Sequence, residues 1–208
     1  MILKKFIEPP IDNNNYLVIN EDSKEAVLID CSSIEVNDKV KDALREYNAK
    51  LKYILLTHGH FDHIAGIRPP VIENEEVPVL MHASDTDWVN NVNIFMQMMG
   101  LSEITVPKIS KYISDNEIIK LGNLDIKVIH TPGHTKGGVC YLIEDKLFTG
   151  DTLFRESVGR CDLEGGDFNE ILASIKNKLY TLPGQTEVYP GHGKSTTIEW
   201  EIEHNSYI

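Results

Sequence analysis

Thr-His-Gly-His-Phe-Asp-His, which spans Thr57 to His63, places three histidines and one aspartate in one short stretch. The apolar run 52–56 directly precedes it and predicts a buried strand. A strand delivers the side chains that follow it to a loop at its end, where metal and small-molecule sites tend to lie. Because zinc and iron prefer neutral imidazole and carboxylate ligands, the stretch predicts a metal site.

The alternative interpretation of this stretch is a polar turn with scattered histidines. Histidine accounts for only 8 of the 208 residues. A chance grouping of His58, His60 and His63 within six positions is therefore improbable, and the metal interpretation is favoured.

The composition is that of a soluble protein of ordinary polarity. Apolar residues make up 41% and charged residues 25% of the 208 positions, which is enough to bury a sizeable core. We expect a single domain over residues 1–208. The formal net charge of −12 argues against nucleic-acid binding, which needs basic patches.

The sequence does not suggest export or membrane insertion. Its apolar runs are shorter than the ~20 residues of a membrane span, and its first residues lack the apolar core of a signal peptide. The cysteines Cys31, Cys140 and Cys161 are odd in number and widely spaced, so they predict neither a disulfide framework nor a zinc site. We expect a cytoplasmic protein without membrane contact, as a monomer or small homo-oligomer.

The first half of the chain predicts three strands, a helix and a fourth strand, in that order. Apolar residues recur at helical spacing from Val36 to Tyr47, after a capping residue at Ser32 or Ser33. Polar turns are expected at 12–15 and 20–23. The strands are expected at residues 3–7, 16–19, 26–29 and 52–56.

The middle of the chain links this half to a second one. Pro69-Pro70 and the acidic run 73–76 predict a loop, and 79–81 predicts a short strand. Residues 83–104 are expected to be helical, with methionines that either pack in the core or line a substrate entrance.

The second half repeats the first in outline. An apolar stripe from Phe168 to Leu179 predicts an amphipathic helix, and a last helical segment begins near Thr197. The strands are expected at residues 118–121, 124–129, 138–143, 147–149 and 186–189. Two sheets packed face to face with helices outside would bury both sets of apolar faces.

Three further motifs each follow a predicted strand and carry a possible metal ligand. They are Thr-Pro-Gly-His-Thr with His134, Thr-Gly-Asp-Thr-Leu-Phe with Asp151, and Pro-Gly-His-Gly with His192. Each motif alone is weak, because a single histidine in a glycine-rich turn is usually a surface residue. Together with the first stretch they supply ligands for two metal ions and a bridging carboxylate, which can hold one hydroxide between two cations.

These four motifs, in this order, resemble the metallo-β-lactamase superfamily. Within it the chain is most similar to the glyoxalase II (hydroxyacylglutathione hydrolase) branch in a short, single-domain form. The resemblance implies an α+β fold, a four-layer αββα sandwich of two similar halves with the site at one edge of the sheets. It implies one metal ion on His58, His60 and His134, a second on Asp62, His63 and His192, and a bridge from Asp151.

The resemblance also implies hydrolysis of a thioester such as S-lactoylglutathione. A metal-bridging hydroxide would attack the carbonyl, with Asp151 as the bridge and Asp62 as a ligand and possible proton carrier. The two divalent ions are expected to be zinc, with iron or manganese as alternatives. Since true β-lactamases carry a cysteine where Asp151 stands, antibiotic hydrolysis is not expected.

The substrate-binding residues are less well matched. Arg160 stands where glyoxalase II relatives have a basic residue that contacts glutathione, but it could equally form a salt bridge with Asp162 or Asp167. Cys161 and Asp162 replace the aromatic residue that helps to hold glutathione, and the added C-terminal helical region of that branch is not matched. Another thiol carrier or another acyl thioester therefore stays open as the substrate.

Other interpretations of the same residues remain. One is a persulfide dioxygenase, which would use one iron held by two histidines and a carboxylate. Another is a lactonase or other ester hydrolase on the same site. Cys161 beside Arg160 could be a redox-sensitive thiol with a lowered pKa. The remaining histidines His82, His130 and His204 are expected to be structural or exposed.

Overall fold

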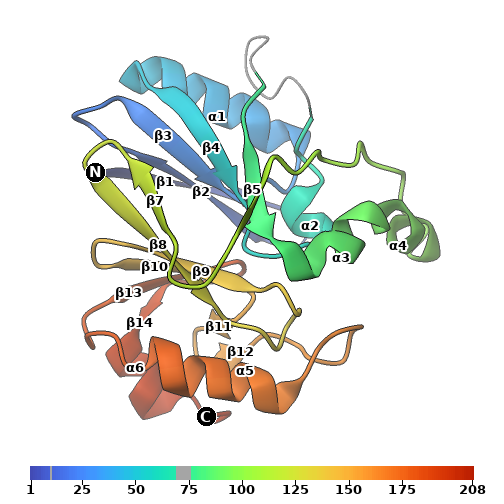
Figure 1. The fold of residues 1–208 in the computed structure, drawn as a ribbon, viewed down its shortest axis with the longest axis vertical. Helices are drawn as coiled ribbons and strands as arrows, with labels where there is room; N and C mark the ends of the chain where they lie inside the picture. Colours follow the sequence, from blue (N-terminus) through green and yellow to red (C-terminus); the bar gives the residue numbers. More distant parts are fainter. Residues whose placement is uncertain (10, 69–75) are drawn as a thin grey trace.

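The computed structural model describes residues 1–9, 11–68 and 76–208. Two six-stranded sheets pack face to face, and helices cover both outer faces (Figure 1). This is the four-layer αββα arrangement, so the predicted fold class is confirmed. The loop predicted at Pro69-Pro70 lies outside the described residues, as does most of the acidic run that follows it.

The first sheet has the order β1-β2-β3-β4-β5-β6. Its first three strands pair antiparallel, and β3 to β6 pair parallel. Helix α1 (Ile34–Tyr47) begins at the cap Ser33 and covers its outer face. The strands are β1 (Ile2–Glu8), β2 (Asn13–Ile19), β3 (Glu25–Ile29), β4 (Lys50–Leu55), β5 (Val79–His82) and β6 (Lys111–Ile113).

The second sheet has the order β14-β13-β10-β9-β8-β7. Its outer face is covered by α5 (Phe168–Ser174), the π-helical turn η2 (Ile175–Leu179) and α6 (Ile198–His204). A small separate hairpin joins β11 (Leu153–Phe154) to β12 (Ser157–Val158). The sheet strands are β7 (Ile118–Leu121), β8 (Leu124–His130), β9 (Val139–Ile143), β10 (Lys146–Gly150), β13 (Glu187–Pro190) and β14 (Thr196–Thr197).

The alternation of side chains along the strands explains why there are four layers. In β2, Tyr16 and Val18 face the second sheet, whereas Leu17 and Ile19 pack in the cluster under α1. Successive residues of a strand point to opposite faces, so an apolar strand can serve two cores at once. A register shift of one residue would exchange the two sets.

Strand β2 begins earlier than expected, and the short strands β6, β11, β12 and β14 were not expected. Residues 13–15 were expected in a turn, but they begin β2 and are buried. The buried polar groups of Asn14 donate hydrogen bonds to backbone carbonyls far away in the sequence. Its side chain donates to Pro190 O at 2.9 Å, and its backbone N donates to Gly191 O at 2.7 Å. Strand β6 was not expected, because in this edge strand only Ile113 is buried.

The middle segment is helical only in part. It forms η1 (Ala83–Asp85), α3 (Thr86–Asn90) and α4 (Val92–Met98), and α4 ends before Gly100, which has a φ of 70°. These helices lie beside α2 (Phe61–Ile64), at the edge where the two sheets meet (Figure 1). Val89, Val92 and Met96 of this segment pack in the same core cluster as α1.

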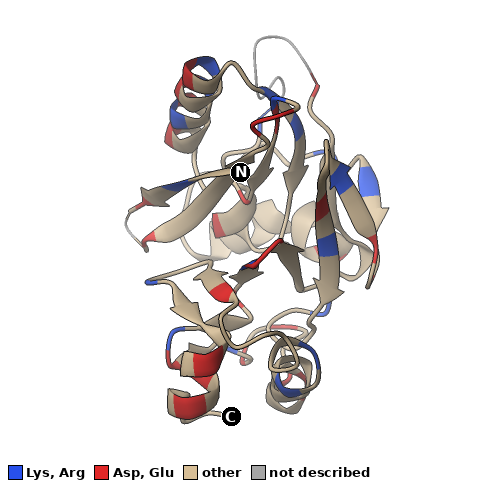
Figure 2. Cartoon of the chain, turned by 90° about the vertical axis from the view of Figure 1, so that its left-hand side faces the viewer, with Lys and Arg blue, Asp and Glu red and all other residues tan. Residues whose placement is uncertain are grey.

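Charged side chains are frequent on the outer helices. Figure 2 shows mixed signs along α1 and mainly acidic side chains on α6, where Glu199, Glu201 and Glu203 lie. In the described ranges, no helix is both long enough and apolar enough to cross a membrane.

Candidate metal centre

Four loops meet at one edge of the two sheets and bring the predicted ligands together. The loop after β4 carries His58 and His60, and α2 begins at Phe61 and carries Asp62 and His63. The other three loops come from the second half, directly after β8, β10 and β13. They carry His134, Asp151 and His192.

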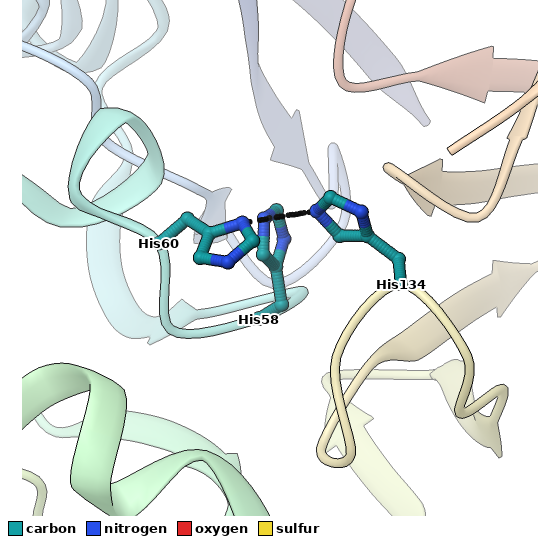
Figure 3. A group of neighbouring side chains, drawn as sticks. All are labelled: His58, His60 and His134. Carbon is teal, nitrogen blue, oxygen red and sulfur yellow. Dashed lines mark hydrogen bonds between the residues drawn. The ribbon is translucent and has the colours of Figure 1, made fainter. Parts of the chain in front are cut away.

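The first group of ligands contains three buried histidines, His58, His60 and His134. Nε2 of His134 lies 3.3 Å from Nε2 of His58 and 2.9 Å from Nδ1 of His60. Figure 3 shows the three rings converging from two separate loops. We call this the histidine group.

The second group contains Asp62, His63 and His192, and we call it the carboxylate group. Oδ2 of Asp62 lies 3.6 Å from Nε2 of His63 and 3.4 Å from Nε2 of His192. The carboxylate of Asp151 lies between the two groups. Its Oδ2 is 3.7 Å from Nε2 of His134 and 3.5 Å from Nε2 of His192.

The ligand atoms have the spacing and the chemistry that metal ions require. Within each group, the ligand atoms lie within 4.8 Å of one another. Nε2 of His63 and Oδ1 of Asp151 are buried and have no hydrogen-bond partner. Because buried polar atoms are nearly always paired, these two orphaned atoms fit a cation as the missing partner.

Four of the histidines are oriented by a hydrogen bond from the ring nitrogen that points away from the site. Nδ1 of His134 donates to Arg160 O at 2.7 Å, and Nδ1 of His192 donates to Ile11 O at 3.0 Å. Nδ1 of His58 lies 3.1 Å from the Thr57 hydroxyl, and His63 contacts a carboxylate described below. With Nδ1 occupied, each ring offers Nε2 to the site, as metal-binding histidines do.

The two groups differ in their electrostatics. Burial, followed by the charges on His63 and His60, lowers the pKa of His58 well below its usual value. Burial, together with the charge on His134, lowers the pKa of His60 to about 3. These imidazoles are therefore neutral at physiological pH and have a lone pair available for a metal ion.

In the carboxylate group the opposite charges stabilise each other. Burial favours the neutral form of His192, but hydrogen bonds to Asp151 and Asp62 outweigh it and raise the pKa of His192 to about 10. Burial opposes ionisation of Asp62, but His63 and His192 lower its pKa to about 2. The pKa of His63 is raised and that of Asp151 is lowered in the same way, despite the burial of both.

Asp30 is a functional residue that the sequence analysis missed. It is buried, and its Oδ2 lies 2.8 Å from Nδ1 of His63. It also accepts hydrogen bonds from the backbone N and the hydroxyl of Thr57, both at 2.8 Å. Asp30 thus fixes the ring of a ligand and the start of the ligand loop. Its place directly after a predicted strand, like that of Asp151, is a signal that could have revealed it.

Asp85 was also missed, and it joins the two halves. It accepts hydrogen bonds from Gly59 N at 2.9 Å, from the Thr135 hydroxyl at 2.8 Å and from Gly137 N at 2.6 Å. Gly59 belongs to the first ligand loop, and Thr135 and Gly137 belong to the loop of His134. Nothing in the sequence around Asp85 indicates this role.

The candidate ligands of all four loops lie within the part of the chain that matches a known protein family. Residues 9–192 match the metallo-β-lactamase superfamily. The chain belongs to this superfamily. Its relatives include "Probable metallo-hydrolase YqgX" of Bacillus subtilis, which is 32% identical over 96% of this chain and 93% of the relative. "Probable polyketide biosynthesis zinc-dependent hydrolase BaeB" of Bacillus velezensis is 34% identical over 86% of this chain and 72% of the relative.

Solved structures of the metallo-β-lactamase superfamily superpose over nearly the whole chain. The B3 metallo-β-lactamase BLEG-1 is 36% identical with a TM-score of 0.88, over 99% of both chains. The di-iron-bound form of TTHA1623 is 33% identical with a TM-score of 0.85, over 99% of this chain and 100% of that one. ETHE1 of Myxococcus xanthus is 27% identical with a TM-score of 0.81, over 99% of this chain and 84% of that one.

A cavity of about 810 Å³ opens above the metallo-β-lactamase ligand loops. His60, Asp62, His134, Asp151 and His192 line it on one side. Its walls are largely apolar and include Trp88, Phe95, Met98, Met99, Phe154 and Leu163. Of the three methionines in the middle segment, Met96 is buried in the core, whereas the other two line this cavity.

Arg160 lines the same cavity, but its guanidinium is paired. Nε and an Nη of Arg160 donate to the two carboxylate oxygens of Asp162 at 2.7 and 2.8 Å. This is the salt bridge that the sequence left as an alternative to substrate binding. The hypothesis that Cys161 has a lowered pKa is wrong: burial raises it, and Asp167 and Asp162 raise it further.

The other histidines lie outside the two ligand groups. His82 stacks on His130 with ring centroids 4.1 Å apart, and Nε2 of His130 lies 2.9 Å from Lys136 O. His204 stacks on Trp200 at 4.0 Å. Their contacts agree with the structural or surface roles expected of them.

Proposed function

We propose that the protein is a metal-dependent hydrolase that cleaves thioesters. The observation that carries this proposal is the carboxylate of Asp151, which lies between two ligand groups at the floor of an open cavity. Two similar proteins bear the names of a probable metallo-hydrolase and a zinc-dependent hydrolase, which supports the reaction class.

We further propose that two divalent ions occupy the site, one in each group, with Asp151 as the shared ligand. Nitrogen and carboxylate ligands suit zinc, iron and manganese. The zinc-dependent name of BaeB and the di-iron form of TTHA1623 support zinc and iron respectively. The protein's own contribution is to present lone pairs in a fixed direction, through the hydrogen bonds on the outer ring nitrogens.

The bound ions would polarise the substrate carbonyl and supply hydroxide at neutral pH. The chain itself favours the ionised form of Asp62, whose pKa is about 2, and the neutral form of His60, whose pKa is about 3. Asn13 donates to Oδ2 of Asp62 at 3.1 Å and directs this carboxylate to the site. A thiol leaving group has a pKa of about 8.5 and departs as a thiolate, so no dedicated acid is required.

The test combines metal analysis of the purified protein with an assay on S-lactoylglutathione and simple acyl thioesters. Two metal ions per chain and hydrolysis of at least one thioester are expected. A lactone and a β-lactam belong in the same panel, since the chain is similar to a B3 metallo-β-lactamase. Metal-loaded protein that cleaves a lactone or β-lactam but no thioester would overturn the proposed substrate class.

A second candidate is the mononuclear-iron persulfide dioxygenase left open by the sequence. The similarity to ETHE1 fits this candidate. It predicts one iron per chain and oxygen uptake on glutathione persulfide, whereas the hydrolase predicts two metal ions and no oxygen uptake. The presence of both complete ligand groups favours the hydrolase.

A further inference from the structure

We propose that the cavity selects substrates by a medium-length apolar acyl group, and not by the charged groups of a glutathione carrier. The inference rests on the proposed hydrolase function and names its substrate class. Four features carry it: an aromatic wall that begins at His60, exposed methionines at the rim, an apolar wall from the second half, and an arginine that is paired with an aspartate.

The aromatic wall begins at the histidine group. The indole of Trp88 packs edge-on against His60, with ring centroids 4.4 Å apart. Phe95 extends this wall, since its ring lies 4.4 Å from that of Trp88. A substrate with its carbonyl at the metal centre would therefore place an adjacent hydrocarbon group directly against Trp88 and Phe95.

Met98 and Met99 continue the wall towards solvent. Their side chains are 79% and 59% exposed, although both line the cavity. Burying this apolar area under a ligand is favourable, at roughly 25 cal/mol per Å². Methionine is also the apolar side chain that adapts best to ligands of differing shape. The two residues are therefore suited to cover an acyl chain.

The opposite wall comes from the second half of the chain and is apolar too. Phe154 lies with its ring 6.1 Å from that of His192, and Val158 and Leu163 line the cavity beyond it. Apolar surfaces thus flank both ligand groups. A hydrocarbon group can be held between them, whereas a peptide would leave its polar groups without partners.

The charges around the cavity do not favour a glutathione carrier. Among the described lining residues, Arg160 is the only Lys or Arg, and its Nε and one Nη already pair with Asp162. Glu164 adds a negative charge to the lining. Recognition of the carboxylates of glutathione needs cations that are not already paired.

The first experiment measures hydrolysis by the metal-loaded protein across a series of N-acetylcysteamine thioesters, from acetyl through butanoyl and hexanoyl to octanoyl. We expect kcat/KM to rise roughly threefold to fourfold per added methylene, the size of the transfer free energy. Efficient hydrolysis of S-lactoylglutathione with no rise across the series would overturn the apolar-acyl inference. It would leave the hydrolase proposal intact.

Binding is then measured without turnover, so that failure of the apolar-acyl inference can be distinguished from failure of the hydrolase proposal. In a Trp200→Phe variant, Trp88 is the remaining tryptophan, since the chain has 2. Its fluorescence is titrated with 2-butanone, 2-hexanone and 2-octanone, which cannot be hydrolysed. We expect the Kd to fall roughly threefold per methylene. A Kd that does not depend on chain length would overturn the inference, even if thioesters are cleaved.

A matched pair of variants locates the effect on the rim. Met98→Gln keeps the length of the side chain but makes the wall polar. Ile94→Gln changes an apolar residue of the same helix that is 56% exposed and lies outside the cavity lining. We expect the octanoyl-to-acetyl ratio of kcat/KM to fall about tenfold in Met98→Gln and to stay unchanged in Ile94→Gln. An equal fall in both variants, or none in Met98→Gln, would contradict the inference.

Discussion

The histidine group and the carboxylate group lie side by side, yet they are built differently. His58, His60 and His134 are buried, and burial lowers the pKa of His58 and of His60, so that these two rings are neutral and have a lone pair available. In the carboxylate group, His192 is 25% exposed, and it forms ion pairs with Asp62 and Asp151. The first group depends on desolvation, and the second depends on balanced charge.

This difference indicates how each group would respond to substitution of a residue and to protonation. A neutral, buried group loses its geometry when any ring is removed, because its nitrogens contact one another directly. The charged group has carboxylates that hold protons on its histidines when no cation is bound, so protons and metal ions compete there. Asp151 faces both groups, and its removal should therefore have the largest effect.

Replacement of Asp151 by Asn should lower kcat at least about a thousandfold, as expected for a group that acts together with the other ligands. The metal content should fall as well, because the shared ligand is lost. Activity is measured on the best thioester, and metal content by elemental analysis. Asp125→Asn, an exposed change on β8, is the matched control. If Asp151→Asn retained both metals and full activity, the bridging role would be wrong.

Removal of His134 should lower metal content more than removal of His192. His134 is buried and contacts both other histidines of its group, whereas the His192 ring is partly exposed; Asp151 lies within 3.7 Å of both. Each variant is expected to weaken metal binding in its own group, and the loss is expected to be larger in His134→Ala because that ring is buried and contacts two further histidines. Competition with a chelator measures both affinities. Equal losses in the two variants would mean that the groups do not differ as described.

Asp30→Asn should weaken metal binding in the carboxylate group about 10-fold to 100-fold, the usual effect of losing a carboxylate that orients a histidine ligand. The histidine group should be affected less, because its link to Asp30 passes through Thr57 only. Site-resolved affinities follow from stepwise metal titration. Asp22→Asn, which changes an exposed turn, serves as the control. A loss of the same size in both groups would contradict this division.

The metal-free protein should show a modest pH effect from His192. Its pKa is raised to about 10 in the folded state, above an unfolded value near 6.5. The ion pairs of His192 therefore add stability below about pH 6.5, and this contribution is lost as the pH rises towards about 10. Urea unfolding of the metal-free wild type and His192→Asn should differ most at low pH. A difference that does not change with pH would contradict this prediction.

The sequence was enough to propose the candidate ligands, which the structure brings together, whereas most of their supporting residues could not be predicted. Each ligand follows a strand in a short motif, so local patterns are enough to find it. Asp85 contacts Gly137 across 52 positions, and Asn13 contacts Asp62 across 49, and no local pattern encodes such contacts. Asparagine favours turns, which is why residues 13–15 were misplaced; their buried partners outweigh that preference.

The substrate cavity was predictable only in outline. The sequence indicated that methionines in the middle segment either line an entrance or pack in the core, and the structure shows both. Arg160 could not be assigned from the sequence, since its partner depends on how residues 157–167 turn. The pairing with Asp162 follows from that local turn.

The contact between His60 and His134 spans 74 positions of the chain, and it has a consequence for how the protein matures. While only the first half is folded, each group lacks one of its three residues, His134 or His192, and the shared Asp151 is missing as well. We therefore expect metal loading to be completed only after the two sheets have docked, as a late step of folding. The metal content of a preparation should then measure the fraction of molecules that have completed their fold.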